Sequence, residues 1–169
     1  MSTVAAMLII GSSFAVAGLI IFRENRHCSM LKNADELMLQ IKNRALYYSE
    51  PLTDILRSIS DCDNKHIRSF CADFISESDL HSTGAPDVWC STVDKIYGRY
   101  LVQYECDVLK HFGENICRSS KNEIINCYNK AYSDITEFIK TADDKRRTNT
   151  KSSAAISISL GIMLVVMLF

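Results

Sequence analysis

The sequence predicts an all-α protein, a six-helix bundle anchored in a membrane by one transmembrane helix at each terminus. Three observations predict this fold. The two ends of the 169-residue chain carry no charged side chain, and all 19 basic and 20 acidic residues fall between Arg23 and Lys151. Only two prolines, Pro51 and Pro86, interrupt the charged region. Within it, apolar residues recur at helical spacing, and the alternation typical of strands is absent.

The two uncharged ends are long enough to cross a bilayer. Residues 4–22 form a 19-residue stretch that reaches about 28 Å as a helix, at ~1.5 Å per residue, and residues 152–169 are just sufficient. Ala15-Val16-Ala17 resembles a signal-peptide cleavage site, but no basic residue precedes it and the apolar run continues to Phe22. A retained span is therefore favoured over a cleaved signal. We assign 4–22 and 152–169 to transmembrane helices and 23–151 to one helical domain.

The basic residues that flank these stretches predict the orientation of the chain. Arg23 and Arg26 follow the first stretch, four basic side chains lie within residues 145–151, and the outer tails hold no Lys or Arg. Basic flanks tend to stay in the cytoplasm. We therefore expect a cell-membrane protein with residues 23–151 in the cytoplasm and both termini outside. The net charge of -1 gives no electrostatic reason to expect nucleic acid as a partner.

Capping and turn signals divide the central domain into six helices. The first, about 25–47, continues from the first span. Prolines suit the first turn of a helix, so Pro51 and Pro86 are expected to open the second and fourth helices. Asp61 to Asn64 can cap the third. The fifth is expected at about 97–117, and Ser120 to Glu123 has the form of a capping box for the sixth, which runs on toward the second span.

Gly113 is the unusual residue of the stretch DVLKHFGENIC, Asp107 to Cys117. Apolar residues recur there at helical spacing, yet a glycine inside a helix costs roughly 1 kcal/mol relative to alanine. Either the helix stops at Gly113 or another group comes close to the backbone. We expect a turn at which the fifth and sixth helices come closest, with Glu114 on the outer face.

The sequence offers little for catalysis. Asp107 and His111 are four residues apart, but an exposed helical ion pair is the simpler interpretation. Tyr97, Tyr100 and Tyr104 are more typical of a bundle core than of a ligand platform. The seven cysteines match no common zinc spacing and, in a reducing cytoplasm, are read as small buried thiols. We predict no catalytic residue, no metal and no cofactor.

Three local motifs, taken with the terminal spans, resemble the stage III sporulation protein AB family. The motifs are RALYYSEPLTDIL, PDVWCSTVDKI and YECDVLKHFGENIC. The matching residues are Pro51, Leu52, Asp54, Trp89, Glu105, Leu109, Phe112, Gly113 and Glu114. Lys110 lies among them, and we treat it as a further candidate interaction residue. Cys117 stands where the family commonly has a second glycine.

The resemblance implies a role that composition alone does not. The family acts in sporulation as a mother-cell membrane component of the channel complex that joins the mother cell to the forespore. Its soluble domain is similar to the cytoplasmic helical domain of the platform proteins of type II secretion and type IV pilus machines. The implied function is a non-enzymatic scaffold, and the implied partners are other stage III channel proteins, including the secretion-type ATPase stage III sporulation protein AA.

Two other functions stay open at this point. One is a membrane-tethered signalling module, and the other is a thiol-redox or metal enzyme. Homo-oligomer formation is also left open by the sequence.

Overall fold

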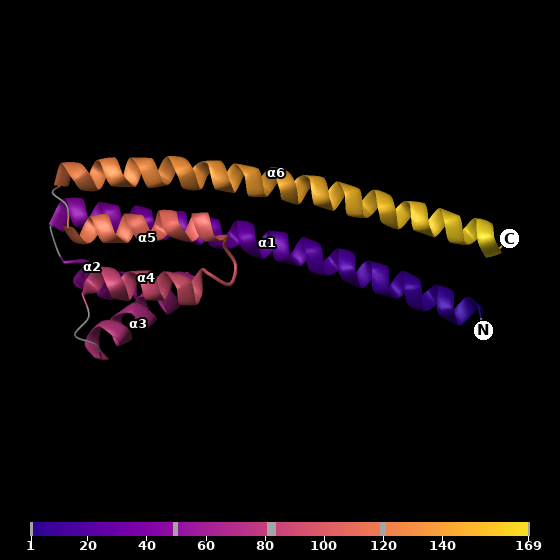
Figure 1. Ribbon diagram of the computed structural model, residues 1–169, viewed down its shortest axis with the longest axis horizontal. Coiled ribbons are helices and arrows are strands. Elements are labelled where there is room, and N and C mark those ends of the chain that lie inside the picture. Colours follow the sequence, from indigo (N-terminus) through magenta and orange to yellow (C-terminus); the bar gives the residue numbers. More distant parts are fainter. Residues whose placement is uncertain (1, 49–50, 81–83, 119–120, 169) are drawn as a thin grey trace. The chain divides into compact units, whose positions relative to one another are not determined.

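The computed structural model describes residues 2–48, 51–80, 84–118 and 121–168. This described part of the chain is helical and contains no strand, so the all-α, six-helix prediction is confirmed. The helices are α1 Ser2–Tyr48, α2 Leu52–Ile59, α3 Lys65–Leu80, α4 Ala85–Ile96, α5 Gln103–Arg118 and α6 Lys121–Leu168 (Figure 1).

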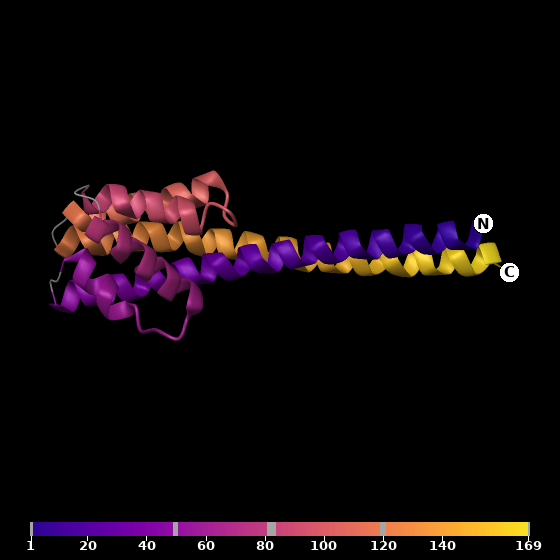
Figure 2. The same cartoon turned by 90° about the horizontal axis from the view of Figure 1, so that it is seen from below.

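The chain forms two compact units, and α1 and α6 contribute residues to both. The terminal unit contains Met1–Cys28 and Lys140–Phe169, and the central unit contains Ser29–Ile139. In the terminal unit, the Glu24 carboxylate lies 3.3 Å from Lys145 Nζ and accepts a hydrogen bond from the Asn149 side-chain amide. Both views place the two ends of the chain at the same end of this unit (Figures 1 and 2).

The two expected transmembrane segments are helical, since residues 4–22 belong to α1 and residues 152–168 to α6. Among the described residues, no helix is long and apolar enough to cross a membrane. Most side chains of the two segments lie outside those that the structure describes. The membrane assignment therefore stays a prediction.

The core of the central unit is built from the apolar stripes that helical spacing predicts. Within it α2 packs on α3, α3 on α4 and α4 on α5. The buried residues of α1 in this unit include Leu31, Ala34, Leu37, Met38, Ile41 and Ala45. Those of α3 are Ile67, Phe70, Cys71 and Phe74. These stripes confirm the predicted helix faces.

Helix starts agree with the sequence signals at α3 and differ slightly at α2. The Asn64 side-chain oxygen accepts the N–H of His66, and its amide nitrogen donates to Asn33 of α1, so one residue caps α3 and ties it to α1. Pro51 is the N-cap of α2 and not its first helical residue. Its carbonyl accepts the N–H groups of Asp54 and Ile55.

The fifth helix begins later than the sequence predicts. Residues 97–100 form a turn and Leu101 a bend. Helix α5 starts at Gln103 because Glu105 accepts the N–H of Val102 at 2.9 Å, as a capping carboxylate does. Tyr97 is buried as predicted for a core tyrosine. Tyr104 is 58% exposed, so its assignment to the core is wrong. The capping box predicted at Ser120 lies outside the described residues.

Candidate interaction site

Trp89 of α4 is the centre of the residues that the sequence motifs single out. It is 1% exposed. Its ring lies 4.9 Å from that of Phe70, 6.3 Å from Phe74 and 6.4 Å from Phe112, centroid to centroid. Aromatic pairs at these separations add stabilisation beyond the burial of apolar area. The indole is therefore held on several sides and has little room to shift.

The polar atom of this indole binds the backbone of α5. Trp89 Nε1 donates a hydrogen bond of 2.8 Å to the carbonyl of Leu109. In an α-helix that carbonyl also faces the amide of the residue four positions on, which here is Gly113. A Cβ atom added at Gly113 would lie closer than 3.0 Å to Nε1, Cδ1 and Cε2 of Trp89. The indole reaches the Leu109 carbonyl because Gly113 has no side chain.

The expected turn at Gly113 and the expected approach of the sixth helix are therefore wrong, whereas the alternative that another group comes close to the backbone is confirmed. Gly113 lies inside α5, which continues to Arg118. The group that approaches it is Trp89 of α4 and not the sixth helix. A glycine serves here because only a position without a Cβ atom leaves space for the indole.

Lys110 and Glu114 connect α5 to α4 at the edges of this contact. Lys110 Nζ lies 2.7 Å from the Asp94 carboxylate, and this hydrogen bond raises the pKa of the lysine. Glu114 accepts a hydrogen bond of 3.5 Å from the Cys90 thiol. Burial, and then the hydrogen bond to Glu114, raise the pKa of Cys90 to about 11. Glu114 is thus half-buried against α4, and its predicted place on the outer face is wrong.

The remaining motif residues are structural in this arrangement. Leu52 is buried in the core, and Pro51 beside it is the exposed cap of α2. Glu105 is 2% exposed and caps α5. Pro51 and Leu52 lie on a different helix from the Trp89 cluster, so the motif residues form two separate places in the fold.

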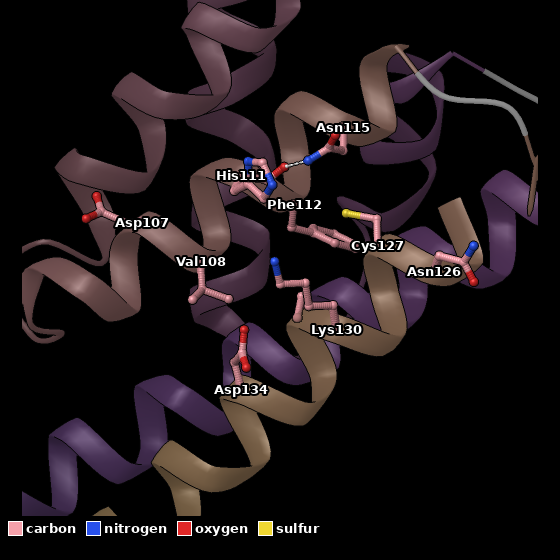
Figure 3. A pocket seen from close by; sticks show the side chains of 10 residues that line it. Asp107, Val108, His111, Phe112, Asn115, Asn126, Cys127, Lys130 and Asp134 are labelled. Atoms are coloured by element: carbon pink, nitrogen blue, oxygen red, sulfur yellow. Dashed lines mark hydrogen bonds between the residues drawn. The ribbon is translucent and has the colours of Figure 1, made fainter. Parts of the chain in front are cut away.

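A groove lies between α5 and α6 in the central unit. It has a volume of about 460 Å³. Figure 3 shows side chains of both helices around it, with Lys130 extending from α6 toward α5. Its lining residues are Asp107, Val108, His111, Phe112, Asn115, Asn126, Cys127, Lys130, Ala131 and Asp134.

A thiol, an imidazole and a carboxylate meet in this groove without forming an activated nucleophile. Burial raises the pKa of Cys127, and nearby Lys130 offsets only part of this shift. Reactive cysteines instead have a lowered pKa, because the thiolate is the nucleophile. The Asp107 carboxylate accepts a hydrogen bond from Gln103, and the backbone carbonyl of His111 accepts one from Asn115. The groove is better suited to binding than to covalent chemistry.

The expectation of buried thiols holds for three of the seven cysteines. All seven are free thiols, with Cys28, Cys71 and Cys106 buried and the other four half-buried. No group of three or more His, Cys, Asp or Glu side chains that could hold a metal ion occurs among the described residues.

The family described as stage III sporulation protein AB matches residues 2–169. The chain belongs to that family. No curated protein and no solved structure matches it significantly. In this stage III sporulation protein, two of the motifs that carry the resemblance meet where Trp89 contacts Leu109 and Gly113.

Sequence reasoning missed the α6 side of the groove. Cys127, Lys130 and Asp134 are spaced i, i+3 and i+7, which places them on one face of α6. This spacing could have indicated that the three residues share a face. A helix face with two charged residues, however, is normally interpreted as exposed to solvent unless a neighbouring helix is known to lie beside it.

Proposed function

We propose that this stage III sporulation protein is a non-enzymatic platform component of the channel complex between mother cell and forespore, needed for spore formation. The observation that carries the proposal is the family match over residues 2–169. The arrangement of the motif residues supports it, because Trp89, Leu109 and Gly113 are engaged in the packing of α4 against α5. A scaffold needs a rigid body of this kind.

The proposed location is the mother-cell membrane, with residues 4–22 and 152–169 spanning it. Support comes from the absence of charge in both segments and from the basic residues that flank them. Residues 23–151 would then face the mother-cell cytoplasm, where the ATPase of the channel would meet them. In this arrangement both ends of the chain lie outside.

An impermeant maleimide tests this topology on intact sporulating cells. Cys62 and Cys90 are half-buried, and we expect neither to react until the cells are permeabilised. Cys62 should then react faster, because the raised pKa of Cys90 leaves it almost entirely in the thiol form at neutral pH.

Two variants serve as controls for the labelling. Ser2→Cys should react without permeabilisation, because residue 2 is expected outside. Cys62→Ser should remove the faster signal. Strong labelling of Cys62 in intact cells would reverse the topology and with it the proposed contact with a cytoplasmic ATPase.

Copurification tests the partners. The tagged full chain, extracted in detergent from sporulating cells, should retain the secretion-type ATPase and other stage III channel proteins. Recovery of signalling proteins or thiol oxidoreductases in their place would favour one of the two other functions named above.

Lys110→Ala and Glu114→Ala test, in the same copurification experiment, whether the ATPase binds at the edge of the α4–α5 contact. We expect both variants to retain the ATPase, because the two side chains are directed to Asp94 and Cys90 of α4. Loss of the ATPase from a variant that still unfolds at the parental temperature would contradict this and would make the edge of the α4–α5 contact a docking surface.

A further inference from the structure

The groove between α5 and α6 has an apolar floor and charged rims. Val108, Phe112 and Ala131 contribute apolar atoms to it. Large apolar side chains of α5 and the turn before it are exposed near one end, with Val102 47% and Tyr104 58% accessible. Phe112 and Ala131 are almost fully buried and Val108 is half-buried, so most of the open face of the groove comes from the polar and charged side chains at its rims.

Two ring contacts fix the register of the antiparallel helices that form the groove. Tyr104 packs on Phe138 at 5.1 Å, and Phe112 lies 6.4 Å from Tyr128. Because the helices are antiparallel, each residue forward along α5 is paired with one residue back along α6. By this register Asp107 lies level with Asp134 along the helices, and His111 lies level with Lys130. Figure 3 shows these four side chains around the groove.

At each of two levels along the groove, the side chains that face each other across it are of the same type, so no ion pair forms between α5 and α6 at these positions. The acidic step consists of Asp107 and Asp134, and the second step consists of the Lys130 ammonium with the imidazole of His111 across from it. Neither Lys130 nor Asp134 belongs to an ion pair between described residues. A surface that places basic residues opposite Asp107 and Asp134, and acidic residues opposite His111 and Lys130, would be complementary to this groove.

We propose that this surface is the α5–α6 hairpin of a second copy of the chain. Two hairpins packed face to face would form a four-helix bundle, a common way for helical hairpins to dimerise. A twofold axis perpendicular to the helices, between the two steps, places Asp134 opposite Lys130 of the second copy and Asp107 opposite its His111. An axis along the helices would instead face acid with acid, which the charges disfavour. The interface is isologous, so each contact occurs twice.

The expected size of the interface predicts a weak dimer that a membrane would strengthen. Helix α5 has 16 residues and so is about 24 Å long, and two adjacent helices present a face about 20 Å wide. Each copy would bury about 500 Å², near the low end for specific association. If the chain is held in a membrane, as proposed above, the local concentration rises and the same face becomes effective.

Charge reversal on full-length protein in detergent micelles tests the dimer. Unlabelled and ¹⁵N-labelled copies are mixed and treated with a carbodiimide, which joins an amine to a carboxylate without a spacer. The parent should give a mixed-isotope peptide pair linking Lys130 to Asp134. Lys130→Asp alone and Asp134→Lys alone should each lower dimer yield about tenfold or more, measured by light scattering after size exclusion, because like charges then face each other in two places.

Mixing Lys130→Asp protein with Asp134→Lys protein is the decisive experiment. A copy with acid at both positions and a copy with base at both positions are complementary, so the mixture should regain the parental dimer yield. The double variant carrying both changes should also regain it. Lys32→Asp and Asp61→Lys, at exposed positions outside the groove, are the matched charge controls and should leave dimer yield unchanged.

Several results would overturn the proposal. These are a monomeric parent without the mixed-isotope pair, single variants that dimerise normally, or a mixture that stays monomeric. Loss of ATPase recovery from Lys130→Asp at unchanged oligomeric state would assign the groove to another protein. Because copurification with channel proteins is measured separately, a chain that stays monomeric and still retains the ATPase refutes the dimer and leaves the platform function in place.

Discussion

Replacing Gly113 by alanine is expected to destabilise the central unit, although the same change in an exposed helix would stabilise it by about 1 kcal/mol. The new Cβ atom overlaps Nε1, Cδ1 and Cε2 of Trp89. Phe70, Phe74 and Phe112 surround the indole, so it cannot withdraw freely. Overpacking costs typically 1 to 3 kcal/mol, and a buried N–H separated from its acceptor costs about 1 to 3 kcal/mol more. We expect a net loss of roughly 2 to 4 kcal/mol.

Fluorescence of Trp89 measures this directly, because it is the only tryptophan in the chain. The midpoint of thermal unfolding should fall by about 2 to 4 °C for each kcal/mol in a protein of this size. Gly113→Val should fall further, since its two methyl groups add bulk at the same place. Gly84→Ala is the matched control, because a Cβ there meets only ordinary contacts, the nearest being Pro86 Cδ at 3.5 Å. A Gly113→Ala chain as stable as the parent would refute the close-contact interpretation.

Helix identity and the buried faces could be predicted from the sequence because both depend on local spacing. The stripe from Leu31 to Ala45 is buried as expected, and Asn64 caps α3 as the turn signal indicated. The sequence places the start of α5 too early, because Tyr97 and Tyr100 continue the apolar pattern while residues 97–100 form a turn. Periodicity does not distinguish a helix from a turn that buries one of its apolar residues, as this turn buries Tyr97.

The contact partners could not be predicted, because they depend on which helices become neighbours. Gly113 was recognised as costly in a helix, but the group that needs its small size is Trp89, 24 positions earlier. Glu114 was placed outside for the same reason, since its partner Cys90 lies on α4. The groove could not be predicted because it depends on the register of α5 against α6. The contact of Tyr104 with Phe138 fixes that register, and the sequence of neither helix alone determines it.

The contact between the indole and Gly113 also predicts that Trp89→Phe will partly rescue Gly113→Ala. The atoms that overlap an added Cβ all belong to the five-membered ring of the indole, which phenylalanine lacks. Trp89→Phe alone should destabilise the chain by about 1 to 3 kcal/mol, because it removes buried area and the hydrogen bond to Leu109. Gly113→Ala should then cost much less in the Trp89→Phe background than in the parent.

A double-mutant cycle on the full chain in detergent micelles, followed by circular dichroism because the tryptophan is lost, measures the coupling. Residues in direct contact typically couple by 0.5 to 3 kcal/mol, and we expect a value of about 1 to 3 kcal/mol in the direction of rescue. Ile59→Val, a small buried change on α2, is the control second site and should be additive with Gly113→Ala. If Trp89→Phe and Gly113→Ala also add without coupling, the cost of the alanine comes from somewhere other than the indole, and Gly113 has another role in α5.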